Sequence, residues 1–456
     1  MIFILLAALI ALTFLSYRLF KRDVLSPAVV LSALFSLCVA LALYNLNRWS
    51  LWDYHLNTAL LVLWGVVAFI GASYVVDRLF QRRFREKLAL PLQLSARTVP
   101  IDWVKLALVV AFDLLALAYF WSEVRRIAIL GGYSEGGLWT MMRTYRQTYS
   151  YTVLPAGQGL PWLMYQFIKL ITVFAYVYLY QFINNVTADR FRIRYAALLV
   201  PVLLSFVQTL MNAGRMEILR LAAAALVMLY VLWQRSGNWD RRLGRKQWLY
   251  VGAFAAFMLG AFYLLANVVG RRVYDDAIYN LSVYTSGPVK LFDMFLQDPP
   301  KPSGIWGQET FYGIHQFLSK YFDIGQPYIR HLEFRSVQDI NVGNIYSAFR
   351  RYYYDFGFLG LTVLQAINGV IFTAFYRIIK LKRIGNKAGI GLLLYAFIAF
   401  NLFMLPIDDL VYSTMVSVSS FTTYILLALA YWFLFVFEWQ DVRRVLVHLK
   451  PGGKAA

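Results

Sequence analysis

Residues 56–76 of the chain read LNTALLVLWGVVAFIGASYVV, a run that contains no charged side chain. At the 1.5 Å rise of an α-helix, about 20 apolar residues cross the hydrocarbon core of a bilayer. Apolar runs of similar length recur along the chain, separated mostly by short charged loops. This rhythm predicts an all-α polytopic membrane protein.

We expect about eleven transmembrane helices, which together form a single helical domain over residues 1–456. Composition agrees, because 60% of the residues are hydrophobic and only 15% are charged, against roughly 25% charged residues in soluble domains. The predicted spans are 2–20, 26–44, 56–76, 102–121, 161–183, 195–213, 216–234, 247–266, 355–376, 388–406 and 413–437.

The distribution of basic residues among the loops predicts the orientation. One alternate set of loops and the C-terminal tail carries 25 Lys and Arg, whereas the other set, although longer, carries 15. Basic loops stay in the cytoplasm, so we expect a cytoplasmic C-terminus and an external N-terminus. The first span has no charge before it and Arg18, Lys21 and Arg22 after it, the reverse of a cleavable signal peptide.

Two external segments have enough chain to build a site. The larger is the loop at 267–354, which is rich in aromatic residues; these suit sugar rings or an interfacial belt equally well. The smaller is 122–160, where apolar residues recur at helical spacing from Leu138 to Tyr149, as in a helix lying on the membrane surface.

Several classes of site are not indicated. The chain has no phosphate-binding GxxxxGKS/T loop, no Rossmann glycine fingerprint and no HExxH motif. Its four histidines lack metal-ligand spacing, and its single cysteine, Cys38, cannot form an intrachain disulfide. The net charge of +20 is explained by the cytoplasmic loops. We therefore expect no metal, no soluble cofactor and no nucleic-acid partner.

Five arginines lie on the predicted outer side, against the positive-inside bias. Arg215 is at the turn between two apolar helices, and the other four bracket the large loop: Arg271, Arg272, Arg350 and Arg351. Forked, permanently charged donors suit a phosphate or diphosphate. The alternatives are contact with lipid headgroups for Arg215 and, one turn further on, a helix-stabilising pair between Arg220 and Glu217.

Four residues are candidates for the group that accepts a proton: His315, His331, Asp408 and Asp409. Repulsion between the two adjacent carboxylates would raise one pKa. The alternative for the aspartates is capping of the next helix, and a lone loop histidine is more often structural. The large loop also carries further candidate acid–base groups, the acids Asp275, Asp276, Glu309, Asp323, Glu333 and Asp339.

Residues 344–350 read NIYSAFR and residues 354–360 read YDFGFLG. These stretches resemble a motif of the bacterial oligosaccharide repeat-unit polymerases, the Wzy-type O-antigen and capsule polymerases, with Ser347 where the pattern often has threonine. The turn with Arg215, the segment 284–288 and the Asp408–Asp409 pair are similar to further features of that family. The number of spans and the single large outer loop fit along nearly the whole chain.

The resemblance implies a GT-C-like glycosyltransferase of the bacterial plasma membrane that needs no metal. Its substrates would be undecaprenyl-diphosphate-linked oligosaccharides, joined into O-antigen, capsular or exopolysaccharide on the outer face, with Asn344 and Tyr354 among the substrate-binding residues. Membrane lipids and a chain-length regulator protein are the partners it suggests. The alternatives are an O-antigen ligase and, in another class, a lipid-linked glycan flippase or transporter. A flippase typically has charges deep inside several helices and two similar halves.

Overall fold

The uncharged run at residues 56–76 lies within helix α3 (Leu56–Arg83) of the computed structural model. The helix continues past the apolar run and ends with Arg82 and Arg83 in its last turn. Cations at this position complement the negative end of the helix dipole.

The structure describes most of the chain. It leaves out residues 85–97, 152–153, 155–156, 213, 238, 240, 248, 250–251, 254–255, 257, 259, 261–262, 265–276, 323–330, 382–388 and 439–456.

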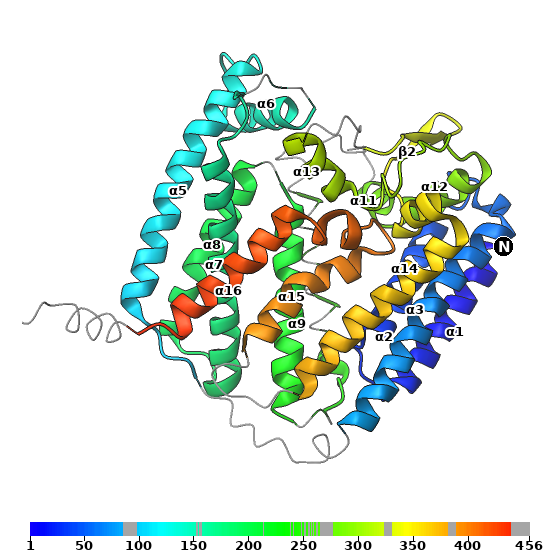
Figure 1. The fold of residues 1–456 in the computed structure, drawn as a ribbon, viewed down its shortest axis with the longest axis horizontal. Coiled ribbons are helices and arrows are strands. Elements are labelled where there is room, and N and C mark those ends of the chain that lie inside the picture. The colour runs from blue at the N-terminus through cyan, green and yellow to red at the C-terminus, as the bar shows by residue number, and fades with distance from the viewer. Residues whose placement is uncertain are drawn as a thin grey trace, which may run out of the picture.

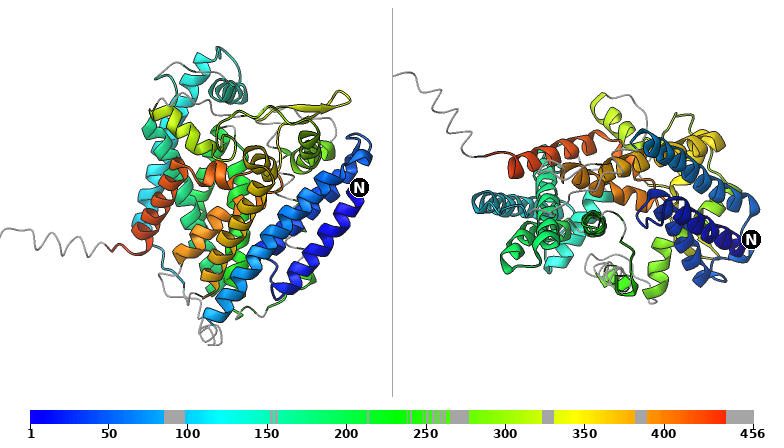
Figure 2. Two further views of the ribbon diagram at one scale, coloured as in Figure 1. Left: turned by 45° about the vertical axis from the view of Figure 1, so that its right-hand side comes forward. Right: turned by 90° about the horizontal axis from the view of Figure 1, so that it is seen from below.

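Within the described part, nine helices are long and apolar enough to cross a membrane, and they form one bundle (Figure 1). They are α1 (Ile2–Leu19), α2 (Pro27–Ala42) extended by η1 (Leu43–Asn45), α3, α5 (Trp103–Leu130), α7 (Trp162–Asp189), η3 (Ile193–Leu199) continued by α8 (Val200–Met211), α9 (Met216–Arg235), α14 (Ala348–Leu381) and α16 (Val418–Phe435). In a second pair of views, α1 to α3 lie on one side of the bundle and α5 to α8 on the other (Figure 2).

The predicted class, an all-α polytopic membrane protein, is confirmed. Each of the nine helices corresponds to one predicted span. The predicted span 388–406 is occupied by α15 (Gly389–Met404), an apolar helix of 16 residues. The predicted span 247–266 falls largely outside the described residues.

Helices α3 and α14 pack closely because glycines face the partner helix. A Cβ added at Gly369 of α14 would lie 2.5 Å from the carbonyl oxygen of Phe69, and one added at Gly65 of α3 would lie 2.6 Å from the ring of Phe349. The Ser73 hydroxyl donates a hydrogen bond to the Gly369 carbonyl at 3.3 Å. A larger side chain at either glycine would force the two helices apart.

Helix α14 has a kink at Gly357, whose φ of 64° and ψ of −155° are not helical. Glycine adopts this conformation without the steric cost that a side chain would bring. The helix begins at Ala348, so Arg350 and Arg351 lie in its first turns rather than in an extended loop. The kink separates these turns from the membrane-crossing part.

The large loop folds into short elements at one end of the bundle, where α1 also begins (Figure 1). They are α11 (Ala277–Thr285), α12 (Gly287–Gln297), α13 (Tyr312–Phe322) and a hairpin of β1 (Arg335–Val337) and β2 (Ile340–Gly343). We call this the insert end. The predicted helix in 122–160 is present as α6 (Leu138–Tyr151) and lies across the same end.

The opposite end, which we call the basic end, is held by buried ion pairs. Asp23 accepts a hydrogen bond from the Tyr376 hydroxyl at 3.0 Å and pairs with Lys380 of α14. Arg377 pairs with Asp77 of α3. These bonds join the ends of three helices across the cytoplasmic side that the loop charges predict.

Candidate active site

Arg350 is the centre of a buried charge network at the insert end. Its guanidinium pairs with Glu309 and, at 2.6 Å between Nη2 and Oε2, with Glu333. It also lies over the Tyr346 ring, 4.6 Å from the centroid, and the residue is fully buried. A desolvated charge without partners is costly, so the two carboxylates explain how this arginine is tolerated in the interior.

Asp355 fixes the segment that carries Glu309. Its carboxylate accepts hydrogen bonds from the backbone N–H groups of Thr310 at 2.7 Å and Glu309 at 3.2 Å. The Thr310 hydroxyl donates to the carbonyl of Arg351 at 3.2 Å. Residues 309 and 310 are therefore fastened directly to the first turns of α14.

Arg351 joins the same segment to the turn after α15. Its Nη1 donates to the Glu309 carbonyl at 3.1 Å, and its Nε lies 3.4 Å from Oδ1 of Asp408. The Asp408 side chain is 30% exposed, whereas Asp409 is completely buried. Of the two adjacent carboxylates, only that of Asp408 is partly exposed.

Asp409 organises the short helix η4 (Val411–Met415). Its carboxylate accepts hydrogen bonds from the backbone N–H groups of Val411, Tyr412 and Ser413 at 2.9–3.2 Å. The Tyr352 hydroxyl of α14 donates to the same carboxylate at 2.9 Å. This geometry is that of the capping alternative, because the acid satisfies N–H groups that have no partner inside the helix.

Burial raises the pKa of three of these four acids. It raises the pKa of Glu309 to about 7 and that of Asp409 to about 6, in spite of the neighbouring arginines. Burial also raises the pKa of Asp408, and Arg351 opposes the rise. For Glu333, burial is outweighed by the charge and hydrogen bonds of Arg350, and its pKa lies below the ordinary value. The expected repulsion between the adjacent aspartates contributes to the pKa of Asp409, but less than burial does.

The two predicted histidines lie on the surface of the insert. The ring Nε2 of His315, on α13, donates a hydrogen bond to the Trp306 carbonyl at 3.0 Å. His331 is exposed and precedes β1. The hydrogen bond that the structure describes for His315 thus goes to a backbone carbonyl, near the segment that holds Glu309.

Arg215 is 3% exposed and precedes the first residue of α9. Its guanidinium lies over the ring of Tyr284 of α11, 5.3 Å from the centroid. One turn further on, Arg220 and Glu217 form the alternative ion pair, with 3.0 Å between Nη1 and Oε1. Arg215 thus contacts the insert through α11, whereas Arg350 and Arg351 contact its later segments. Arg271 and Arg272 lie outside the described residues.

Two further predicted residues hold the backbone of the insert. The Asn344 amide donates to the Leu332 carbonyl at 3.2 Å, and the Tyr354 hydroxyl donates to the Lys301 carbonyl at 2.9 Å. With Arg350 and Asp355, these polar residues of the segment 344–360 connect the insert to α14.

Glu309, Glu333 and Asp355 were not among the predicted site residues. The first two were expected as acid–base groups of the large loop, and Asp355 belongs to the motif stretch 354–360, but no spacing rule connects the two glutamates with an arginine far along the chain. The one local signal was the density of aromatic residues around 306–317. There, the Trp306 and Phe311 rings stack with centroids 5.3 Å apart.

No family model, curated protein or solved structure matches the chain. Its function is therefore inferred from the chemistry of the site and from the resemblance of its motifs.

Proposed function

We propose that the protein polymerises undecaprenyl-diphosphate-linked oligosaccharide repeat units at the outer face of a bacterial plasma membrane. The insert end would face the exterior and the basic end the cytoplasm. The multi-pass helical fold supports a substrate with a lipid tail, and the folded insert supplies an extramembrane surface large enough for a glycan.

The observation that carries the proposal is the position of the segment 344–360. The residues that resemble the polymerase motif are the ones that hold the insert against α14 and surround the network of Arg350. The same cluster includes Asp408 and Asp409, which belong to a different part of the resemblance.

The proposed reaction transfers a glycan from its diphosphate to the terminal sugar of a new repeat. The acceptor hydroxyl oxygen bonds to the anomeric carbon, while the bond from that carbon to the diphosphate oxygen breaks and leaves its electron pair on the diphosphate. A base must take the hydroxyl proton. We assign this role to Asp408, because it is partly exposed and its described hydrogen bonds, from Arg351 and from the Asp409 N–H, are both to Oδ1.

Arginines would stabilise the negative charge that develops on the diphosphate, without help from a metal ion. Arg215 and the pair Arg271 and Arg272 are the proposed donors, whereas Arg351, which is paired with Asp408 and the Glu309 carbonyl, would orient the base. Arg350 has a different role in this proposal, since its guanidinium is taken up by Glu309 and Glu333. It would position the insert rather than contact the substrate.

The test is reconstitution of the purified protein in liposomes with a lipid-linked repeat unit. A ladder of polymers with free undecaprenyl diphosphate as co-product would support the proposal. Transfer to lipid A–core in place of a ladder would indicate the ligase, and movement of the intact lipid-linked repeat between leaflets without transfer would indicate a flippase.

A further inference from the structure

Two neighbouring hollows meet near the basic end and differ sharply in character; the larger extends along the bundle as far as Phe403, in the last turn of α15. One is an apolar groove of 840 Å³ between α1, α2, α9 and α15, lined among others by Ile10, Val29, Ala33, Leu226 and Phe403. The other is a pocket of 270 Å³ lined by four arginines: Arg18, Arg22, Arg241 and Arg242. No carboxylate of the described residues lines the arginine pocket.

The groove and the arginine pocket are adjacent and share part of their walls. Phe14, Tyr17 and Val24 line both of them. The guanidinium of Arg18 lies over the ring of Phe14, 4.6 Å from its centroid. An apolar wall therefore ends directly at a positive charge, which is the arrangement that an amphipathic anion requires.

The arginine pocket has a defined structure. The Gln234 amide of α9 donates to the Arg241 carbonyl at 2.8 Å and to the Tyr230 hydroxyl at 3.1 Å. The Tyr230 hydroxyl donates to Asp23 at 2.9 Å. These bonds hold the segment after α9 against the turn between α1 and α2.

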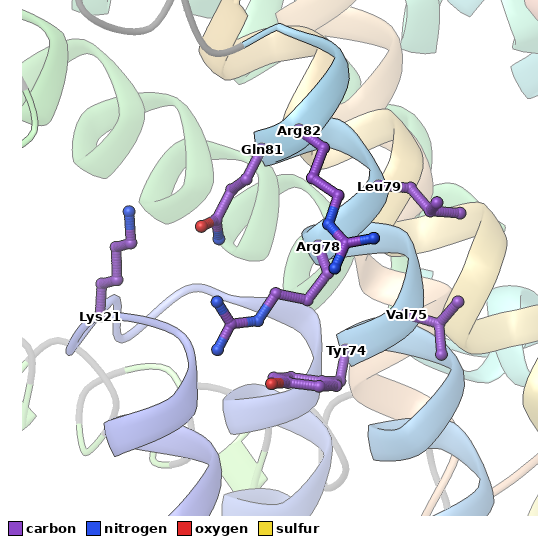
Figure 3. A pocket seen from close by; sticks show the side chains of 7 residues that line it. All are labelled: Lys21, Tyr74, Val75, Arg78, Leu79, Gln81 and Arg82. Carbon is purple, nitrogen blue, oxygen red and sulfur yellow. The ribbon is translucent and has the colours of Figure 1, made fainter.

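That turn has an unusual backbone. Lys21 and Arg22 both have positive φ, 57° and 62°. Consecutive non-glycine residues with positive φ are uncommon and costly, and such geometry is often retained where a function requires it. Here it puts Arg22 in the arginine pocket, while Lys21 lines a different pocket with Arg78 and Arg82 (Figure 3).

We propose that the groove and the arginine pocket together bind an anionic glycerophospholipid from the cytoplasmic leaflet. One acyl chain would lie in the groove, and the phosphate would accept hydrogen bonds from the arginines. Arginine is the side chain best suited to this contact, since its planar fork matches phosphate oxygens and stays charged. The arginine pocket lies at the end of the bundle away from the proposed glycan chemistry, and the proposal does not depend on that chemistry.

The experiment measures bound phospholipid by native mass spectrometry. The full-length protein is released from nanodiscs that contain equal amounts of phosphatidylglycerol and phosphatidylcholine. We expect one retained phosphatidylglycerol and a preference of roughly tenfold over phosphatidylcholine, because each basic residue near a membrane surface adds to the attraction for anionic lipid. Equal retention of the two lipids by the unmodified protein would overturn the proposal without any variant.

Two variants test the two parts of the site separately. Replacing Arg18, Arg22, Arg241 and Arg242 by glutamine should lower the retention of phosphatidylglycerol about tenfold or more. Ala33→Trp fills the groove but keeps every charge, and it should also lower retention. If Ala33→Trp retains the lipid fully, the groove holds no acyl chain and the proposal fails.

The pocket in Figure 3 provides the matched control. Arg78→Gln with Arg82→Gln removes two charges from the same end of the bundle, at a pocket whose lining includes only Val75 and Leu79 as aliphatic residues. This variant should retain phosphatidylglycerol as the unmodified protein does. An equal loss would mean unspecific attraction by surface charge. Inorganic phosphate at millimolar concentration should not displace the lipid, and displacement would mean a site for free phosphate instead.

Discussion

Nε of Arg351 lies 3.4 Å from Oδ1 of Asp408, and this pair joins the first turns of α14 to the turn after α15. The adjacent acid, Asp409, is buried and accepts three backbone hydrogen bonds from η4. Two neighbouring carboxylates therefore have different environments, and their substitutions should have different consequences.

Asp408→Asn is expected to lower turnover on lipid-linked repeats by about 100-fold or more, which is the usual contribution of a positioned base. Its free energy of unfolding should fall by about 1–3 kcal/mol, because the buried Arg351 loses its charged partner, so turnover is compared per amount of folded protein. The measurements are polymer formation in liposomes and thermal unfolding in detergent.

Asp409→Asn is the matched comparison. Asparagine keeps the acceptor Oδ1 but replaces Oδ2 with an NH2 donor facing the Ser413 N–H, so the free energy of unfolding should fall by about 1–2 kcal/mol. Loss of turnover in Asp409→Asn alone, at normal stability, would reverse the two roles. If His315→Ala or His331→Ala abolishes turnover while both aspartate variants retain it, the base lies in the insert.

Arg350 should matter mainly for stability. Arg350→Ala leaves Glu309 and Glu333 without their shared partner, and breaking a buried pair costs roughly 3–5 kcal/mol. Arg350→Lys keeps one charge, but a single ammonium cannot form both ion pairs, so an intermediate loss is expected. Thermal unfolding and limited proteolysis of the insert measure this. A stable Arg350→Ala protein that lacks only activity would instead indicate direct contact with the substrate.

Stability should fall with rising pH because of Glu309. Its pKa in the folded protein is about 7, above the value of about 4.3 in an unfolded chain. The folded state thus binds the proton more tightly. The stabilisation that this gives the folded state is fully present below about pH 4.3 and is lost as the pH rises through about 7. The slope is at most about 1.4 kcal/mol per pH unit.

Glu309→Gln should flatten the dependence between pH 6 and pH 7, since glutamine does not titrate; at lower pH the raised pKa of Asp409, about 6, adds a slope of the same sign. Unfolding midpoints of both proteins from pH 5 to pH 8 provide the comparison. Parallel curves for Glu309→Gln and the unmodified protein would show that Glu309 is ionised throughout this range, as its pairing with Arg350 alone would favour.

The membrane helices were predictable because a bilayer imposes length and apolarity on each span. The ion pair between Arg220 and Glu217 was also predictable, because residues three apart on one helix lie on the same face, and the two side chains do pair in the structure. The start of α14 at Ala348 was not predicted. Its first turns are polar, and they are helical because they are packed against the insert.

The partners of Arg350 could not be read from the sequence. Glu309 is 41 residues away and Glu333 is 17 residues away, and the fold of the insert between them decides which acids reach the guanidinium. The sequence indicated which loop carries the acids, but the tertiary structure determines which of them pair with Arg350. The different environments of Asp408 and Asp409 likewise depend on tertiary structure alone.

The orientation is testable with reporters. An alkaline phosphatase fusion inserted near residue 303 should be active, because the insert end is proposed to be external. Fusions after residue 90 and at the C-terminus should be inactive, and green fluorescent protein at the C-terminus should fluoresce. An active phosphatase at the C-terminus would reverse the bundle and place Arg215 and Asp408 on the cytoplasmic side.

Substitutions of Arg215 distinguish binding of the diphosphate from a purely structural role of this residue. Arg215→Lys keeps the charge but loses the forked donor, so turnover should still fall by about tenfold or more. Arg215→Ala should lose more, because a hydrogen bond to a charged group contributes roughly 1.5–3 kcal/mol. Arg220→Lys is the control: it keeps an ammonium beside Glu217 on the same helix face and should polymerise normally. Full polymer length and rate in Arg215→Ala, at normal protein level, would show that the guanidinium serves only its contact with Tyr284 and the packing of α11.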